Sequence, residues 1–158
     1  MLFRDYEPAD HESCLKIFDS NCPPYFDSSE RDLFDNWLTA IDEGGIARES
    51  IEKSYYFVGE WHGVVVSCGG IYSMFNKSEV RLSWGMVSRE HHRKGLGKAL
   101  FRYRFEAFQK RFPEFELKLD TSQLTFPFYE RMNFVITHIE KNGYGPDLDK
   151  YEMTYRQE

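Results

Sequence analysis

The stretch Val80–Phe112, VRLSWGMVSREHHRKGLGKALFRYRFEAFQKRF, decides the fold that we predict for this chain. In its first part, apolar residues alternate with small or polar residues, which is the two-residue period of a β-strand. The residues expected on one face of this strand are Val80, Leu82, Trp84 and Met86. From Leu96 onward the apolar residues recur at helical spacing, and Pro113 ends the predicted helix. The stretch therefore predicts a strand, a basic turn with two glycines and a long amphipathic helix.

The turn between these two elements, His92–Lys98, has the features of an anion-binding site. The first backbone N–H groups of a helix have no partner inside the helix, and the helix dipole adds partial positive charge there. Gly95 and Gly97 let an anion approach the backbone closely. The segment Arg89–Arg111 carries eight basic and two acidic residues, although the whole chain has a net charge of −6. A local basic site in an acidic chain indicates a discrete polyanionic ligand such as a pyrophosphate.

Two other phosphate-binding motifs do not fit this turn. A Walker loop needs the pattern GxxxxGK[ST], whereas Lys98 is followed by Ala99. A dinucleotide-binding fingerprint needs GxGxxG, and Leu100 occupies its third glycine position. The pattern that fits is a strand, then [Q/R]-x-x-G-x-[G/A], then a helix, with His92 at the first motif position and glycine at the other two.

On these residues the chain resembles the GNAT superfamily of acyl-coenzyme-A-dependent acyltransferases. A second stretch supports the resemblance, because Phe128–Phe134, FYERMNF, is similar to the FYEKLGF element of that family, with Asn133 in place of glycine. The resemblance implies an α/β fold with a mixed, mostly antiparallel central sheet of about seven strands and helices on both faces. It also implies that the fourth and fifth strands splay apart.

The rest of the chain supplies the elements that such a sheet needs. Periodicity and turn residues predict the order β-α-α-β-β-β-α-β-α-β-β. The second helix is expected to begin with a capping box at Ser29–Asp32 and to bury Leu33, Trp37 and Ile41. Asn142–Pro146 is expected to be the loop between the last two strands.

Length and composition restrict the class of protein. With 158 residues, 41% apolar and 17% aromatic, residues 1–158 are expected to form a single domain with a sizeable core. The chain lacks the apolar run of about 18 residues that a membrane span needs, and because Met1–Asp5 does not resemble the apolar region of a secretory leader, we expect none. The acidic net charge argues against nucleic-acid binding, and three cysteines without metal spacing suggest reduced thiols. We therefore expect a cytoplasmic protein without a metal, for which a homodimer is plausible.

The resemblance further implies acetyl-coenzyme A as co-substrate and assigns the residues that hold it. The pantetheine arm is expected to lie between the splayed strands and to pair with the backbone near the end of the fourth strand. The pyrophosphate is expected on the N–H groups of the glycine turn. The implied cofactor-binding residues are Met86, Val87, Ser88, His92, Arg93, Lys94, Gly95, Leu96, Gly97, Lys98, Ser122 and Tyr129.

The implied reaction is direct attack of an amine on the thioester carbonyl. Tyr129 matches the tyrosine that protonates the leaving thiolate in many members of the family, and a tyrosine with the usual pKa of ~10 is protonated at neutral pH. The general base is not readable from the sequence, and Glu79, His138 and a water molecule are the candidates. Arg81 cannot act as a base, but it could hold an acceptor carboxylate.

Three hypotheses of function follow from these residues. The first is an N-acetyltransferase that acts on a primary amine of a small molecule, an amino-acid derivative or a protein. The second is a non-catalytic acyl-coenzyme-A-binding module that regulates a partner. The third, a nucleotide-phosphate-binding protein, lacks the metal-ligating Ser or Thr that its motif requires. The sequence identifies neither the acceptor nor the length of the acyl group.

Overall fold

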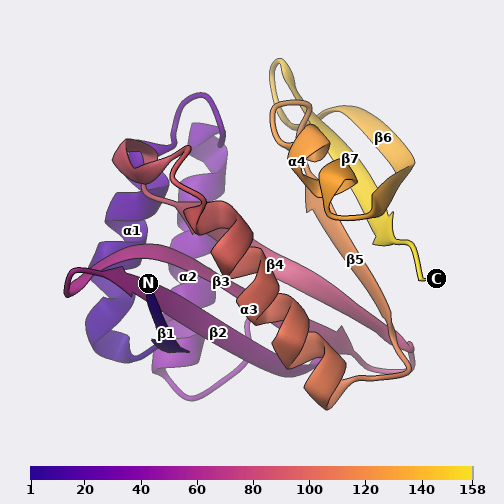
Figure 1. Ribbon diagram of the computed structural model, residues 1–158, viewed down its shortest axis with the longest axis horizontal. Helices are drawn as coiled ribbons and strands as arrows, with labels where there is room; N and C mark the ends of the chain where they lie inside the picture. The colour runs from indigo at the N-terminus through magenta and orange to yellow at the C-terminus, as the bar shows by residue number, and fades with distance from the viewer. Residues whose placement is uncertain (158) are drawn as a thin grey trace.

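The computed structural model describes residues 1–157, which build a seven-stranded sheet with helices on both faces (Figure 1). The strands are β1 (Leu2–Asp5), β2 (Ile51–Trp61), β3 (Val64–Met74), β4 (Glu79–Val87), β5 (Glu116–Thr121), β6 (Phe134–Gly145) and β7 (Leu148–Tyr155). The α-helices are α1 (His11–Ser20), α2 (Arg31–Asp42), α3 (Leu96–Arg111) and α4 (Phe126–Arg131). Short 3-10 helices are η1 (Pro8–Asp10), η2 (Ser28–Glu30) and η3 (Arg89–His91). The predicted order of strands and helices is confirmed.

The sheet opens between its fourth and fifth strands. Its strand order is β1-β2-β3-β4-β5-β7-β6, and the β4–β5 pair is parallel while the other pairs are antiparallel. The parallel pairing extends only from Glu79–Glu116 to Arg81–Lys118. Beyond it the strands diverge, and β5, β6 and β7 stand apart from β1–β4 (Figure 1). The predicted fold class, including the splay between strands four and five, is confirmed.

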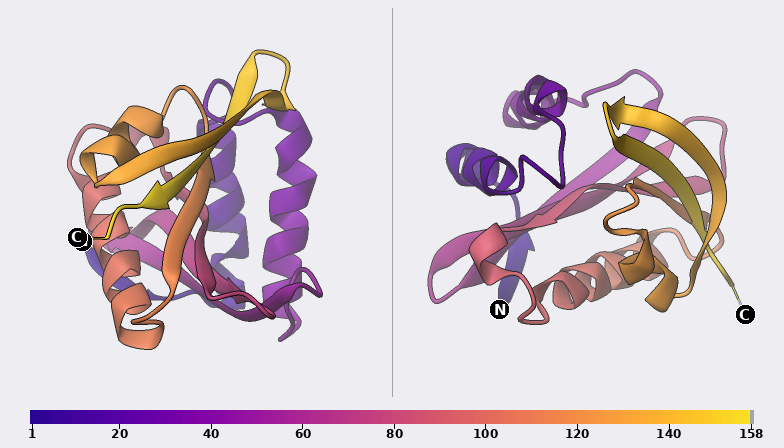
Figure 2. Two further views of the ribbon diagram at one scale, coloured as in Figure 1. Left: turned by 90° about the vertical axis from the view of Figure 1, so that its right-hand side faces the viewer. Right: turned by 90° about the horizontal axis from the view of Figure 1, so that it is seen from above.

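The helices divide the core into two layers. Seen from above, α1 and α2 lie on one face of the sheet, and α3 and α4 lie on the other (Figure 2). Phe18, Phe34 and Leu38 are fully buried on the α1–α2 side. On the α3 side, Phe101 and Phe108 pack with the aromatic and aliphatic residues of β5, β6 and β7. A cleft lined by residues of both layers passes between them.

A β-bulge interrupts β4 close to its end. Met86 pairs with Cys68 but Ser83 pairs with Gly70, so β4 uses one more residue than β3 over this interval. Trp84 stands at the bulge with a positive φ of 38°, a strained conformation that is concentrated at functional sites.

The bulge changes the side to which the following side chains point. Val80 and Leu82 pack in the core cluster on the α3 side, whereas Trp84 and Met86 pack on the α1 side. The prediction that these four residues share one face was wrong for this reason. The sequence alternates regularly through the bulge and gives no sign of the extra residue.

The start of α2 also differs from the prediction. The capping box joins Asp27 and Glu30 around η2, two residues earlier than the predicted Ser29–Asp32. The buried positions of α2 are then Phe34, Trp37 and Leu38, while Leu33 is 61% exposed. The early capping box matters for function, because it places the Glu30 side chain at the edge of the cleft.

The hairpin of β6 and β7 is longer than predicted. Residues 142–145, expected in a loop, belong to β6, and the reversal occurs at Pro146 and Asp147. Asn142 adopts φ +55° and its N–H donates to Asp149 Oδ1 at 2.9 Å, which lets the strand continue past an Asn-Gly pair. Asn133 adopts φ +73° after α4, as the sequence predicted.

Candidate active site

A cleft with a volume of about 710 Å³ runs through the sheet where β4 and β5 diverge. Seven buried side-chain polar atoms of the described residues lack a hydrogen-bond partner, and five of them belong to residues that line this cleft. These five are Asn21 Oδ1, Trp37 Nε1, Ser83 Oγ, His91 Nδ1 and Arg104 Nε. Because such atoms are costly and uncommon in folded proteins, their concentration here indicates a site that a polar ligand completes.

The anion-binding turn forms one end of the cleft. Gly95 is the N-cap of α3 with φ +80°, and a side chain added there would meet nothing within 4 Å. Within residues 1–157 no side chain caps the first amides of α3, and its first turn holds no acidic residue. Arg93 and Lys98 line the cleft, together with Arg131 at the end of α4, which the sequence did not single out. The uncapped amides and these three cations are suited to a pyrophosphate.

His92 holds this turn in place. Its Nε2 lies 2.9 Å from the carbonyl oxygen of Val87, and its ring packs edge-to-face on Tyr25 at a centroid distance of 5.3 Å. The turn is thereby tied to the end of β4. Leu96 is 4% exposed and packs with Val66 and Val87, so only its backbone can face a ligand.

Of the three residues at the end of β4 that were predicted to bind the cofactor through their backbone, only Val87 directs its backbone groups toward the gap between β4 and β5. The Ser88 N–H donates to Val66 O at 2.7 Å and is therefore turned toward β3. Because backbone groups of successive residues in a strand point to opposite sides, Val87 faces the open edge and Met86 faces β3. The Val87 carbonyl already accepts from Asn21 Nδ2 at 2.9 Å, which leaves its N–H as the donor toward the cleft.

Tyr129 lies on α4 and lines the cleft from the α3 side of the sheet. Its ring makes edge-to-face contacts with Phe128 and Phe134, at centroid distances of 5.1 and 5.8 Å, and these contacts fix its position. Ser122 is 3% exposed, and its Oγ accepts from the Leu124 N–H at 3.2 Å in the turn between β5 and α4. Both residues were predicted for the site from the sequence.

The structure brings most of the predicted residues together. Those that line the cleft are Met86, Val87, His92, Arg93, Gly95, Gly97, Lys98, Ser122 and Tyr129. Ser88, Lys94 and Leu96 are not part of its lining. Lys94 is exposed at the tip of the turn, where its charge adds only to the general positive field.

A buried carboxyl group lies at the other end of the cleft. Glu30 is 6% exposed, and its Oε2 accepts from the Asp27 N–H at 2.9 Å. Burial, reinforced by the nearby charge of Asp27, raises the pKa of Glu30 to about 7, against opposing effects of that hydrogen bond and of Lys150. A carboxyl group with this pKa is half ionised near neutral pH, which suits it to accept and release protons.

The sequence matches the family model of the acetyltransferase (GNAT) domain over residues 26–155. This chain belongs to the GNAT acetyltransferase family. It is therefore an acyltransferase, as the resemblance implied. No curated protein is a significant match to this GNAT sequence.

Solved structures share the fold of this GNAT protein along its whole length. A protein described as a GNAT-family acetyltransferase from Desulfovibrio desulfuricans is 20% identical, with a TM-score of 0.78 and 98% of each chain covered. The ribosomal-protein-alanine N-acetyltransferase from Brucella melitensis is 18% identical, with a TM-score of 0.74, covering 99% of this chain and 100% of its own. The acetyltransferase yncA from Salmonella typhimurium, solved with its cofactor acetyl-CoA, is 18% identical with a TM-score of 0.72, covering 100% and 94%. At these identities the likeness shows the fold.

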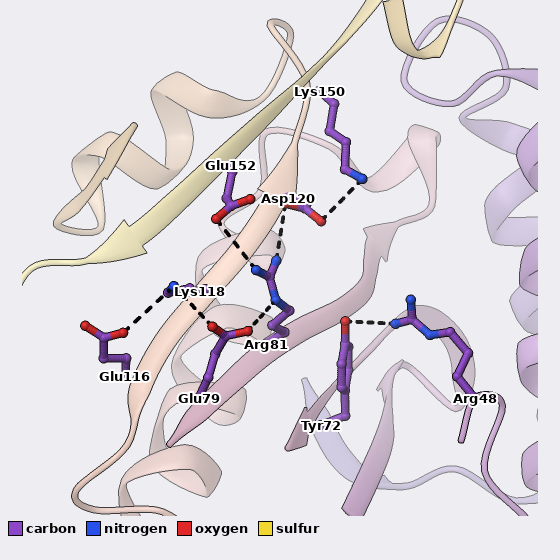
Figure 3. A network of polar contacts seen from close by, with 9 residues as sticks. All are labelled: Arg48, Tyr72, Glu79, Arg81, Glu116, Lys118, Asp120, Lys150 and Glu152. Carbon is purple, nitrogen blue, oxygen red and sulfur yellow. Dashed lines mark hydrogen bonds and ion pairs between the residues drawn. The ribbon is translucent and has the colours of Figure 1, made fainter. Parts of the chain in front are cut away.

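The basic and acidic residues at the start of β4 in this GNAT protein neutralise one another (Figure 3). Arg81 pairs with Glu79 at 2.8 Å and Asp120 at 3.4 Å, with Glu152 at 3.7 Å. Glu79 also pairs with Lys118 at 3.1 Å, and its pKa is lowered because these cations outweigh its burial. Arg81 thus has no uncompensated charge to offer an acceptor carboxylate.

The two side chains that the sequence offered as general bases lie outside the cleft. Glu79 sits in the ion-pair network, and His138 is exposed on β6, and neither belongs to the cleft lining. The wall of the cleft around Glu30 is instead aromatic and is formed by Phe26, Trp37, Tyr72, Trp84 and Tyr144. From the sequence, Trp37 and Trp84 were expected on apolar faces and Tyr144 in a loop. Arg48 Nη2 donates to Tyr72 Oη at 2.9 Å on this wall (Figure 3).

Sequence reasoning missed Glu30 and Arg104, and each carried a weak signal. Glu30 stands three residues after Asp27, which is capping-box spacing and reads as a purely structural feature. Arg104 falls on the apolar face of the predicted helix, where a charged residue is unexpected. Within residues 1–157, no cluster of side chains suits a metal ion and no helix is long and apolar enough to cross a membrane.

Proposed function

We propose that this protein is an N-acetyltransferase that transfers an acetyl group from acetyl-coenzyme A to a primary amine in a ternary complex. The observation that carries the proposal is the single cleft through the splayed sheet. It has uncapped amides and cations at one end and a buried carboxyl group with a raised pKa at the other. An anionic donor and an ammonium acceptor would thus meet between β4 and β5.

The donor half suits coenzyme A by its charge and its backbone. The amides of residues 93–98 would hold the pyrophosphate, with Arg93, Lys98 and Arg131 around it. The pantetheine arm would run along the open edge of β4. The Val87 N–H would then polarise the thioester carbonyl, because it is the backbone donor that faces the opening.

The acceptor half supplies the proton chemistry. Glu30 would take a proton from the attacking ammonium group, since it is a buried acid of the cleft with a pKa near neutrality. Tyr129 would donate a proton to the sulfur as it leaves, from the opposite side of the sheet. The aromatic wall around Glu30 would exclude water and surround the amine-bearing part of the acceptor.

The acceptor itself is a small molecule, an amino-acid derivative or a protein amine in this proposal. One structural neighbour is a ribosomal-protein-alanine N-acetyltransferase and another is an aminoglycoside 6'-N-acetyltransferase complexed with coenzyme A. Both kinds of acceptor present an amine, which agrees with an acidic residue at the acceptor end. A single domain over residues 1–158, a cytoplasmic location and a homodimer stay predictions from the sequence.

The test is an acceptor screen that detects the free thiol released from acetyl-coenzyme A. We expect release that depends on an amine, with the acetylated product identified by mass spectrometry. Binding of coenzyme A without transfer to any amine in a broad panel would favour the non-catalytic regulatory module. Titration with ATP beside coenzyme A separates the third hypothesis, because a nucleotide-phosphate-binding protein would bind both.

A further inference from the structure

Arg104 is a charged residue on the buried face of α3, with a side chain that is 2% exposed. A Cβ atom added at Gly85 would lie 2.6 Å from its Nη2 and 2.7 Å from its Nη1, and one added at Gly69 would lie 3.3 Å from its Cζ. The guanidinium group therefore lies against the backbone of β3 and β4, directly beneath the bulge. The two glycines leave the space that it occupies.

No acidic group of the described chain compensates this charge. The Nε of Arg104 lacks a hydrogen-bond partner, and the ion pairs of residues 1–157 all involve other basic residues. Tyr56 on β2 lies within range of the charge, but burial raises its pKa well above the ordinary value and its hydroxyl donates to Trp84 O. A buried cation without a partner is costly, which indicates that a ligand supplies the negative charge.

The position of Arg104 along α3 indicates which part of a bound coenzyme A its side chain would face. Arg104 stands eight residues after Leu96, or about 12 Å along the axis of α3, and so lies far beyond the phosphate-binding turn. It lines the cleft from the same face of the sheet as Tyr129, because α3 and α4 lie on that face (Figure 2). Phe101 lies between the two elements, with its ring 6.5 Å from that of Tyr129. This is the region in which the thioester end of coenzyme A would lie.

We propose that Arg104 is a catalytic residue that contacts the sulfur of coenzyme A and stabilises its negative charge as the acyl group leaves. The inference rests on the proposed function. The amine nitrogen forms a bond to the carbonyl carbon, the carbon–sulfur bond breaks and its electron pair goes to sulfur. Glu30 has already taken one proton from the ammonium group, and the second proton that the nitrogen loses goes to water. Arg104 keeps its charge throughout, and Tyr129 then gives a proton to the sulfur and regains one from water.

The carbonyl oxygen already has a donor in the Val87 backbone, whereas the sulfur otherwise has only the neutral hydroxyl of Tyr129. A fixed cation beneath the bulge supplies what that hydroxyl lacks, a full positive charge that needs no reorganisation when the bond breaks. The same charge lowers the pKa of the thiol of bound coenzyme A. This effect can be measured without turnover.

The test compares the affinities of coenzyme A and dethio-coenzyme A, which carries hydrogen in place of the thiol, by calorimetry between pH 6 and pH 9. For the natural chain we expect the preference for coenzyme A to grow at least 10-fold over this range, because the complex favours the thiolate. Arg104→Met should abolish this growth and lower kcat about 10²-fold, while its affinity for dethio-coenzyme A stays close to that of the natural chain. Arg102→Met, an exposed arginine of the same helix, is the matched control and should leave the preference intact.

The natural chain alone already decides the matter if Arg104→Met fails to fold. An equal affinity for both compounds at every pH would overturn the inference while leaving the proposed function in place. A stronger, Arg104-dependent use of succinyl-coenzyme A than of acetyl-coenzyme A would also overturn it, because the guanidinium group would then bind an acyl carboxylate. Failure to bind either compound would remove the proposed function itself, and the inference with it.

Discussion

The donor half and the acceptor half of the cleft are built in different ways. The donor half consists of the turn Arg93–Lys98 and the end of β4, which are neighbours in the sequence and expose backbone groups in a fixed order. The acceptor half combines the consecutive elements η2 and α2 with β3 and β6, which lie far from them and from each other in the sequence. A site made of local backbone can be recognised from its pattern, whereas a site assembled from distant side chains becomes visible only in the fold.

Glu30→Gln is expected to have the largest effect, because it removes the proposed proton acceptor of the acceptor half. We expect kcat/KM to fall about 10³-fold, with acetyl-coenzyme A affinity unchanged. The glutamine side-chain oxygen can still accept from the Asp27 N–H, so the start of α2 is preserved. Steady-state kinetics with the best amine of the screen, and calorimetry with coenzyme A, measure the two quantities. Glu12→Gln, an exposed acid on α1, is the control.

The pH dependence of the same residue provides a second prediction. The ionised form of Glu30 is the base, and its pKa is about 7, so kcat/KM of the natural chain should rise as the pH passes through 7. A raised pKa in the folded state also means that stability is lost as the pH rises from about 4.5 through 7. Glu30→Gln should therefore lose the rate increase and gain relative stability over this range. An unchanged pH–rate profile in the variant would exclude Glu30 as the base.

Tyr129→Phe tests the residue that stands opposite Glu30, on the α4 side. We expect kcat to fall about 10²-fold, because the leaving sulfur loses a proton donor, while KM for acetyl-coenzyme A changes little. The ring contacts with Phe128 and Phe134 remain, so folding should be unaffected. Tyr151→Phe, whose ring stacks on Phe126 outside the cleft, is the control. Equal turnover of the variant and the natural chain would remove Tyr129 from the mechanism.

The same contrast explains what could be predicted from the sequence. The strand, turn and helix of residues 80–112 follow from local periodicity and glycine positions, and they led to the correct fold. The bulge at Trp84 could not be predicted, since its alternation is that of a regular strand and only pairing with β3 shows the extra residue.

Glu30 and Arg104 remained hidden for related reasons. The buried state of Glu30 depends on η2 meeting β6 across the splay, a contact between segments more than a hundred residues apart. Arg104 stands out in the sequence only as a charge on an apolar helical face, and its place in the site depends on the space that the glycines of β3 and β4 leave beneath the bulge. In both cases a tertiary contact buries the charged group, and this burial, which the residue type alone does not reveal, gives the side chain its proposed role.

Lys98→Ala should have a moderate effect that is confined to the donor half. The side chain is exposed, so loss of one phosphate contact should cost roughly 1 kcal/mol, or about a 5-fold rise in KM for acetyl-coenzyme A. We expect kcat to be unchanged, and the difference to shrink at high salt because the interaction is screened. Lys110→Ala at the far end of α3 is the control. A fall in kcat without a change in KM would place Lys98 in the chemical step instead.

His92→Gln should have the smallest effect, because His92 departs from the family motif while performing a local structural task. His92 forms a hydrogen bond to the Val87 carbonyl oxygen, which also accepts a hydrogen bond from Asn21. Glutamine can donate the same bond, so thermal stability and acetyl-coenzyme A affinity should stay near those of the natural chain. His92→Ala should instead lose about 1 kcal/mol of stability and loosen the turn, which raises KM slightly. If both variants lost affinity equally, the imidazole would act on the ligand directly, and the donor half would depend on a side chain as the acceptor half does.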